Sequence, residues 1–220
     1  MKIIVMKFGG TSVANIEKIK NVAKIVSINS KKNKIVVVLS AMSGVTNQLQ
    51  SYIDEIDYSP SIETDLVMTS GEQVTVGLLS MILKKQGIRC KPLLGWQIPI
   101  VTDENHEKAR ILNIENKNIH YHFKSHEVIV LAGFQGVSLS GNITSLGRGG
   151  SDTTAVAIAS SLSAERCDIF TDVKGVFTSD PNIVSNAKKI DKLAYEEMLE
   201  MASTGTKVLQ TRSVELALKN

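Results

Sequence analysis

Continuous apolar runs and segments with helical periodicity alternate along the first part of the chain. Residues 2–8 and 35–39 are apolar runs without strict alternation, which is typical of strands that are covered by helices on both faces. Each run is followed by a short segment of small residues and then by apolar positions at helical spacing, within residues 15–30 and 49–56. This repeated order of strand, loop and helix predicts an α/β fold with a parallel sheet.

The same alternation continues through most of the remaining chain. A helix is predicted to open at residues 69–73 and to stop at Gly87, and residues 58–64 are predicted to be a connection. Residues 103–125 are polar and weakly periodic, so no element is predicted there. Further predictions are strands at residues 90–94, 98–102, 128–132 and 167–172, a hairpin after residue 133, and helices at residues 151–163, 195–203 and 206–218. We therefore expect one continuous α/β unit.

Composition places the chain among ordinary soluble proteins and argues against several kinds of partner. Its 220 residues can bury one substantial core, and its net charge of +3 is too small to indicate nucleic-acid binding. No apolar run approaches the roughly 20 residues of a membrane span, and the N-terminus lacks a signal-peptide pattern, so we expect a cytoplasmic protein. Cys90 and Cys167 are isolated, and the three histidines within residues 120–126 lack further ligands nearby, so neither a disulfide nor a metal site is predicted.

The stretch GNITSLGRGGSDTTA at residues 141–155 is the strongest local signal of a binding site. Ser151 and Asp152 suit a helix N-terminus, whose unpaired N–H groups favour an anion, and the preceding glycines let a ligand approach the backbone. Arg148 adds a forked donor for a carboxylate or a phosphate. The stretch is neither a Walker A loop nor a dinucleotide-binding Gly-x-Gly-x-x-Gly loop. We therefore favour an anion site over the alternative, an ordinary turn before a packing helix.

Polar side chains also follow other predicted strands, at the edge where open α/β sheets bind ligands. Lys7 ends the first apolar run and precedes a Gly-Gly-Thr-Ser segment, which favours a phosphate site over a lysine that only reaches solvent. Glu72 lies in the first turn of its predicted helix, where it either binds a ligand or complements the helix dipole. Asp172 either orients a ligand or caps a turn. Together these signals indicate anion binding and phosphoryl transfer.

These segments resemble the signatures of aspartokinases, which belong to the amino-acid kinase superfamily. The resemblance begins with KFGGTSV at residues 7–13 and continues in family order across essentially the whole chain. The other matching blocks are SAMSGVTN at residues 40–47, SGE at 70–72, GFQG at 133–136, LGRGGSDTTA at 146–155, TDVKGVF at 171–177, DP at 180–181 and GTKVL at 205–209. Blocks that match in one order are far more specific than any single motif.

The resemblance implies the amino-acid kinase fold, a three-layer αβα sandwich with a mainly parallel central sheet. It implies an amino-acid-binding lobe at about residues 1–145 and a nucleotide-binding lobe at about residues 146–220. The implied reaction is the ATP-dependent phosphorylation of the side-chain carboxylate of L-aspartate to 4-phospho-L-aspartate, with Mg²⁺ held mainly by the nucleotide phosphates. This reaction is the first step of lysine, threonine and methionine biosynthesis through diaminopimelate.

The same resemblance assigns site residues, position by position. Lys7 and Asp152 would be catalytic, because Lys7 would steady the transferring phosphoryl group and Asp152 would hold the lysines and site loops in register. Aspartate would be bound by Thr46, Glu72, Arg148 and Ser151, with Glu72 on its ammonium group and Arg148 on a carboxylate. The nucleotide would be surrounded by Lys7, Gly9, Gly10, Ser12, Thr171, Asp172, Phe177, Asp180 and Lys207. No side chain is assigned as a direct metal ligand.

The chain departs from the family pattern at three places. Phe177 stands where many relatives carry Tyr, so the ring beside the base is kept and a hydroxyl is lost. Asn182 stands where the family usually has Arg, which puts a phosphate or nucleotide contact in doubt. The sequence ends at Asn220, before the last strands and the regulatory ACT domains of the family, so feedback inhibition by lysine or threonine is not expected.

Two other functions stay open at this point. The chain could be another amino-acid kinase that acts on acetylglutamate or uridylate, although the contexts of Glu72 and Arg148 favour aspartate. It could instead be a non-catalytic binding module, or a fragment that depends on a partner. We expect L-aspartate and ATP as partners, expect neither nucleic acid nor a membrane, and leave a homo-oligomer open.

Overall fold

The α/β class expected from the sequence is confirmed by a computed structural model, which describes residues 1–181, 183–204 and 208–219. In chain order its elements are β1 (Ile3–Phe8), the 3-10 helix η1 (Gly10–Val13), α1 (Ile16–Ser30), β2 (Lys34–Leu39), α2 (Val45–Ile56), α3 (Ile62–Met68), α4 (Ser70–Lys85), β3 (Cys90–Leu93), β4 (Ile100–Thr102), β5 (Ile111–Ile114), α5 (Lys117–Phe123), β6 (Val128–Ala132), β7 (Gln135–Ser138), β8 (Ile143–Ser145), α6 (Gly150–Ser161), β9 (Arg166–Phe170), α7 (Tyr195–Ser203) and α8 (Thr211–Lys219).

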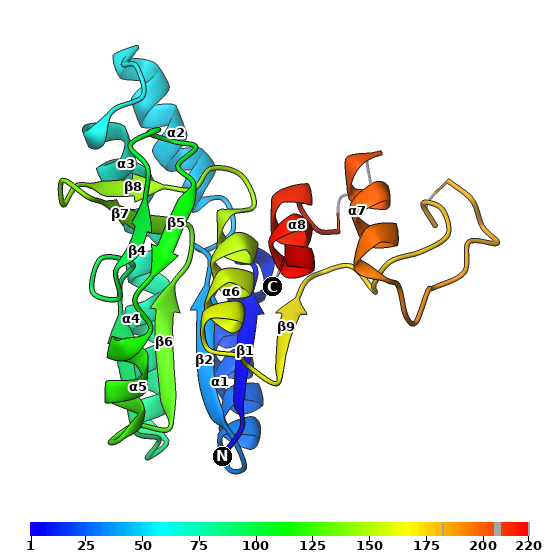
Figure 1. The fold of residues 1–220 in the computed structure, drawn as a ribbon, viewed down its shortest axis with the longest axis horizontal. Helices are drawn as coiled ribbons and strands as arrows, with labels where there is room; N and C mark the ends of the chain where they lie inside the picture. The colour runs from blue at the N-terminus through cyan, green and yellow to red at the C-terminus, as the bar shows by residue number, and fades with distance from the viewer. Residues whose placement is uncertain (182, 205–207, 220) are drawn as a thin grey trace.

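A five-stranded parallel sheet forms the centre of the molecule. Its strand order is β3-β6-β2-β1-β9, and every neighbouring pair is parallel. All carboxyl ends therefore lie along one edge, which is the upper edge in Figure 1. Lys7, near the end of β1, is in register with Val38 of β2 and Ile169 of β9, so its side chain leaves the sheet close to this edge.

Both faces of this sheet are covered, as its unbroken apolar strands require. On one face, Ile4, Met6 and Phe8 of β1 pack in a buried cluster with residues of α1 and α4. On the other face, Val5 belongs to a second buried cluster with residues of β4, α5 and α6. Helices lie on both sides of the sheet in Figure 1, which confirms the expected three-layer αβα sandwich.

A second, smaller sheet was not predicted. It has four strands in the order β5-β4-β7-β8, with β4 and β7 parallel and the two outer pairs antiparallel. The β7–β8 pair confirms the hairpin expected after residue 133. The strand predicted at residues 98–102 corresponds to β4 and belongs to this second sheet. β5 and α5 lie in residues 103–125, where the pattern predicted nothing.

The connection predicted at residues 58–64 is wrong, because α3 begins there. Ser61 and Thr64 form a capping box, in which each side chain accepts a hydrogen bond from the other residue's backbone N–H. The helical stretch Ile62–Lys85 is long and apolar enough to cross a membrane by length and composition alone. Half of its most apolar window is buried, and it carries the buried carboxylates of Asp65 and Glu72. We therefore interpret it as a core helix pair.

The last part of the chain extends beyond β9. This strand ends at Phe170, two residues before the end of the predicted strand. After β9 the chain leaves the sheet, and near its end α7 packs against α8, which packs against α6 (Figure 1). α7 has its predicted bounds, and α8 begins at Thr211 rather than at residue 206. Residues 205–207 of the GTKVL block lie outside the described residues.

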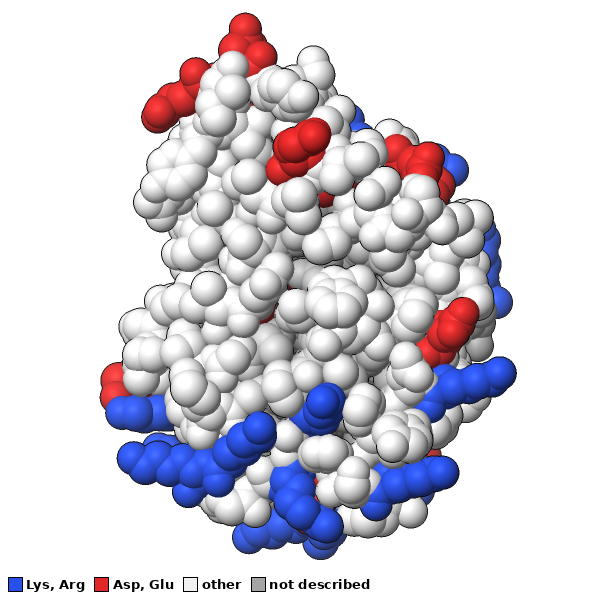
Figure 2. All heavy atoms as spheres, turned by 90° about the vertical axis from the view of Figure 1, so that its left-hand side faces the viewer, with Lys and Arg blue, Asp and Glu red and all other residues white. Residues whose placement is uncertain are grey.

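Charge is divided between the two ends of the face shown in Figure 2. Lys and Arg side chains gather at the lower end, where the central strands begin, and acidic side chains lie mainly at the upper end. Exposed acidic residues of α2 at that upper end include Asp54 and Glu55. The basic side chains on this face are therefore concentrated at one end rather than spread over it.

Gly133, directly after β6, is a point where the sheet leaves no room for a side chain. A Cβ there would lie 2.8 Å from Ser151 Cβ of α6 and 3.0 Å from the Leu39 carbonyl oxygen. We expect Gly133→Ala to destabilise the fold by about 1–3 kcal/mol through this overpacking. The matched control is Gly77→Ala in α4, because a Cβ at Gly77 meets nothing within 4 Å. Its Tm should stay level or rise, since alanine favours helix by about 1 kcal/mol. Equal Tm values for the two variants would contradict the packing.

Candidate active site

A cleft of about 700 Å³ lies at the carboxyl edge of the central sheet. It collects six of the residues that the sequence singled out as catalytic or amino-acid-binding: Lys7, Thr46, Glu72, Arg148, Ser151 and Asp152. They come from β1, α2, α4, α6 and the turn before α6, which are far apart in the sequence. We call this cavity the substrate cleft.

Lys7 and Asp152 form a buried ion pair in the substrate cleft. Lys7 Nζ lies 2.6 Å from Asp152 Oδ1, and the two side chains are 11% and 13% exposed. Among the described residues Asp152 Oδ1 has no partner besides Lys7, so this ion pair compensates the buried oxygen. The alternative of a surface lysine is therefore wrong. The pair joins β1 to the first turn of α6 and leaves a fixed ammonium group beside the cleft.

Glu72 is buried at the start of α4 with half of its carboxylate unpaired. Its Oε1 accepts a hydrogen bond from the backbone N–H of Ala41 at 3.0 Å, whereas Oε2 is buried and has no partner in the part of the chain that the structure describes. Burial raises the pKa of Glu72 to about 7, and the Ala41 N–H opposes the shift only in part. The neighbouring Thr75 hydroxyl donates to the Ser40 carbonyl, which also ties α4 to the loop after β2. Oε2 is thus an acceptor that a ligand can satisfy.

The glycine-rich turn before α6 differs from the prediction in how the helix is capped. Ser151 and Asp152 were expected at the N-cap, but the N-cap is Gly149, without any side-chain cap. Gly147 and Gly149 both have a φ of 73°, a left-handed conformation that glycine adopts readily. Arg148 between them is exposed, and its guanidinium makes no hydrogen bond or ion pair within the described part of the chain. The turn therefore presents a free forked cation to the cleft.

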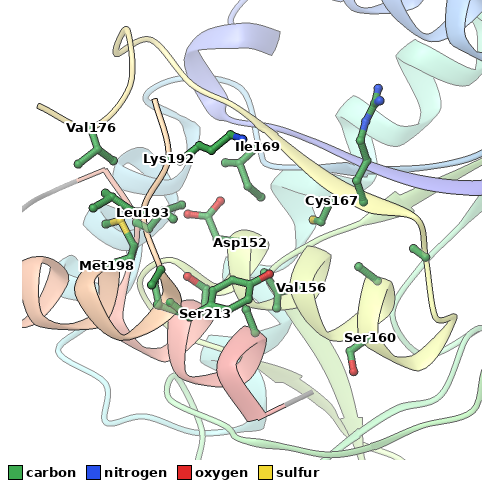
Figure 3. Close-up of a pocket in the computed structure, with 18 of the residues that line it drawn as sticks. Asp152, Val156, Ser160, Cys167, Ile169, Val176, Lys192, Leu193, Met198 and Ser213 are labelled. Carbon is green, nitrogen blue, oxygen red and sulfur yellow. The ribbon is translucent and has the colours of Figure 1, made fainter. Parts of the chain in front are cut away.

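A second cavity, of about 780 Å³, meets the substrate cleft at Asp152. Figure 3 shows Asp152 projecting into it, with Val156 of α6, Ile169 of β9 and Met198 of α7 around it. Cys167 of β9 also lines this cavity, and burial raises the pKa of its thiol to about 12. The thiol is therefore neutral near pH 7 and acts as an apolar wall rather than a nucleophile.

Apart from Lys7, none of the predicted nucleotide residues that the structure describes lines either cavity. Thr171, Asp172 and Asp180 are exposed on the loop after β9, and Phe177 is half-buried in a β-bridge with Lys189. Asp172 accepts a hydrogen bond from Thr171. Lys207 and Asn182 lie outside the described residues. The nucleotide role of this set stays a prediction.

The glycine segment after β1 lies beside the Lys7 ammonium. A Cβ on Gly9 would lie 3.5 Å from Lys7 Nζ, and a Cβ on Gly10 would lie 3.0 Å from the Ala41 carbonyl oxygen. The Ser12 N–H donates to the Gly9 carbonyl and closes the first turn of η1. These residues keep the backbone after β1 close to the Lys7 ammonium, where backbone N–H groups could reach a phosphate.

The substrate cleft also contains residues that the sequence reasoning missed. Glu107 and Ser145 both line it. Glu107 lies in the polar stretch 103–125, where no local signal marks it. Ser145 directly precedes the LGRGGSDTTA block, and its position next to a matching block was the available signal. Among the described residues, no group of three or more His, Cys, Asp or Glu side chains could hold a metal ion.

A sequence model of the amino acid kinase family matches residues 2–220. The chain is 48% identical to an aspartokinase of Rickettsia felis and 52% identical to an aspartokinase of Pseudomonas aeruginosa, and both alignments cover all of this chain. They cover 56% and 54% of those relatives, so the chain spans about half the length of the curated relatives it matches.

Solved structures show the same relationship in three dimensions. Escherichia coli aspartokinase III, solved in complex with aspartate and ADP, superposes with a TM-score of 0.85 at 29% identity, over 99% of this chain and 60% of that one. Uridylate kinase from Archaeoglobus fulgidus superposes with a TM-score of 0.69 at 20% identity, over 100% of this chain and 86% of that one, a likeness of fold alone. The chain belongs to the amino acid kinase family.

Proposed function

We propose that the chain is the catalytic domain of an aspartate kinase, which phosphorylates the side-chain carboxylate of L-aspartate with ATP. Its similarity to aspartokinases over its whole length supports this reaction. The observation that carries the substrate assignment is the unpaired, buried Glu72 Oε2 in one cleft with Arg148. An amino acid with one ammonium group and two carboxylates has the charges that complement this cleft.

Substrate binding follows from the charges on the cleft wall. The ammonium group of aspartate would donate a hydrogen bond to Glu72 Oε2, which has no partner among the described residues, and would offset the cost of burying this oxygen. A carboxylate of aspartate would take two parallel N–H bonds from Arg148. Thr46 and Ser151 supply hydroxyl groups on the same cleft wall. The side-chain carboxylate is ionised at neutral pH, so the nucleophile needs no general base.

Transfer requires two anions to meet, and Lys7 is placed to offset their repulsion. A carboxylate oxygen would attack the γ-phosphorus, and the bond from that phosphorus to the bridging oxygen would break and release ADP. The Lys7 ammonium would steady the charge on the transferring group, while Asp152 holds the ammonium in place. Gly9, Gly10, Ser12, Thr171, Asp172, Phe177, Asp180 and Lys207 remain proposed nucleotide contacts.

The proposed reaction uses ATP whose Mg²⁺ would be held mainly by the nucleotide phosphates. The described residues offer no cluster of three metal-binding side chains, and the buried Asp152 is already paired with Lys7. Mg²⁺ bound to the phosphates would neutralise part of their charge. This chain's own part is the fixed ammonium of Lys7 and the glycine segment beside it.

The same proposal covers the division of the chain into lobes, the place of the enzyme in metabolism and its assembly. The amino-acid lobe would comprise about residues 1–145 and the nucleotide lobe about residues 146–220. The enzyme would work in the cytoplasm, at the first step of lysine, threonine and methionine biosynthesis through diaminopimelate. A homo-oligomer is compatible with it.

A coupled assay of ADP release tests the proposed reaction. ATP turnover should require L-aspartate and Mg²⁺, and N-acetylglutamate and UMP should give only background, since neither offers a free ammonium group to Glu72. Turnover with acetylglutamate or UMP equal to that with aspartate would refute the substrate. Absence of turnover with every acceptor would favour the binding-module alternative.

Replacing Glu72 should stabilise the fold at high pH and at the same time weaken the binding of aspartate. Its folded pKa of about 7 lies above the ordinary value of 4.5, so its contribution to stability is full below about pH 4.5 and is lost as pH rises through 7. Glu72→Gln removes this loss, which is on the order of 3 kcal/mol well above pH 7. The difference between the Tm of Glu72→Gln and the Tm of the unsubstituted chain should therefore increase by several degrees from pH 5 to pH 8. The variant should bind aspartate more weakly. Glu55→Gln on the exposed surface of α2 is the control. A Tm difference independent of pH would contradict the buried, unpaired carboxylate.

Arg148→Lys tests the assignment of the forked cation to aspartate. Lysine keeps the charge and loses the two parallel N–H bonds. We expect the KM for aspartate to rise roughly ten- to a hundredfold, as for loss of about 1.5–3 kcal/mol, with the KM for ATP nearly unchanged. A rise in the ATP constant alone would move Arg148 to the nucleotide site, and two unchanged constants would leave it only a turn residue.

A further inference from the structure

A further buried carboxylate, Asp65 of α3, lies outside the substrate-binding and catalytic residues described above. Asp65 is 0% exposed, and three hydrogen-bond donors surround its carboxylate. Oδ2 lies 2.7 Å from His106 Nδ1, and Oδ1 accepts hydrogen bonds from the Glu107 backbone N–H at 3.0 Å and from the Ser145 hydroxyl at 2.5 Å. An ionised carboxylate only accepts, so all three groups act as donors towards it. Asp65 is therefore fully paired, in contrast to Glu72.

These hydrogen bonds join three segments that are distant in the sequence. Asp65 belongs to α3, His106 and Glu107 belong to the loop between β4 and β5, and Ser145 ends β8. The same loop is also tied to β8 through the backbone, because the Ala109 N–H donates to the Ser145 carbonyl at 3.0 Å. Glu107 has a φ of 64°, a left-handed conformation that is unfavourable for residues other than glycine. The paired Asp65 holds the loop in this conformation.

The loop held by Asp65 presses against the turn that carries Arg148. A Cβ on Gly147 would lie 2.7 Å from the Glu107 carbonyl oxygen, so the two backbones are in close contact. Glu107, Ser145 and Arg148 all line the substrate cleft. A shift of the Glu107 backbone would therefore change the position of the Arg148 turn, and interiors packed this closely transmit such shifts.

We propose that Asp65 and His106 are positioning residues that set the affinity for the amino-acid substrate. They fix the Glu107 backbone, and the Glu107 backbone fixes the turn that aims Arg148. Neither residue lines the substrate cleft, so neither would touch the substrate. The assignment of a substrate carboxylate to Arg148 rests on the proposed function, whereas the coupling from His106 to the Arg148 turn does not.

Three variants of the loop separate positioning from folding. His106→Ala removes the donor to Asp65, whereas His106→Asn can restore a donor near the place of Nδ1. Asn105→Ala is the matched control, because Asn105 is exposed on the same loop and its side chain makes no contact with Asp65. We expect His106→Ala to raise the KM for aspartate about tenfold, since small displacements of binding groups have effects of this size or larger. The KM for ATP and kcat should change little, and His106→Asn should recover most of the loss.

Hydrogen–deuterium exchange gives a readout that is independent of activity. In His106→Ala, the amides of residues 106–109 and of the turn at residues 146–150 should exchange faster, and in Asn105→Ala only those near residue 105 should. Unchanged exchange at residues 146–150 would overturn the coupling, even if the enzyme proved inactive on aspartate. Faster exchange there with an unchanged KM for aspartate would overturn the positioning role. The positioning role would also be overturned if His106→Ala raised the KM for aspartate and the KM for ATP equally, in proportion to its loss of Tm, and if His106→Asn did not restore them. If the unsubstituted chain fails to phosphorylate aspartate, the proposed function fails, and the exchange experiment still decides the coupling.

Discussion

Three ionisable side chains are buried at one edge of a sheet that is otherwise apolar, and the site depends on how each is compensated. Burying a charge is costly unless the charge is paired. Lys7 and Asp152 compensate each other across 2.6 Å, so the ammonium group stays in place without a ligand. Glu72 is compensated on one oxygen only, and burial raises its pKa to about 7 as a result. The cleft therefore keeps one buried carboxylate oxygen open to a donor, which the proposed substrate would supply as its ammonium group.

The parallel sheet explains why these groups meet. Its carboxyl ends all lie on one edge, so Lys7 at the end of β1 and the loops after β2 and β6 converge there. Gly133 leaves room for the first turn of α6 to approach the sheet, which brings Ser151 and Asp152 to the same edge. The substrate cleft and the second cavity then share Asp152 as a common wall. A fixed ammonium in the substrate cleft is suited to a transfer between two anions.

The parts of this arrangement that the sequence predicted are those with a local signal. The central strands were predictable because burial on both faces leaves unbroken apolar runs, as in β1 and β2. Six of the residues that line the substrate cleft were predictable because each lies in or next to a motif at a strand or helix end. The second sheet was not, because β5 is half-exposed and its polar sequence carries no clear period. The capping of α6 was also misjudged, since a left-handed Gly149 replaces a side-chain cap. The pairing of Asp65 with Glu107 and Ser145 spans 42 and 80 residues, a distance over which a single sequence gives no signal.

We propose above all that Glu72 Oε2 accepts a hydrogen bond from the ammonium group of the substrate. The most direct measurement is an NMR titration of the Glu72 side-chain carboxyl, first in the free chain and then with saturating L-aspartate. In the free chain the carboxyl should titrate near pH 7, because burial disfavours its charged form. Bound aspartate should lower this pKa by at least one unit, because an ammonium group in contact favours the carboxylate. Succinate, which lacks the ammonium group, should not lower it. A Glu72 pKa that is unchanged by aspartate, or lowered equally by succinate, would contradict the account.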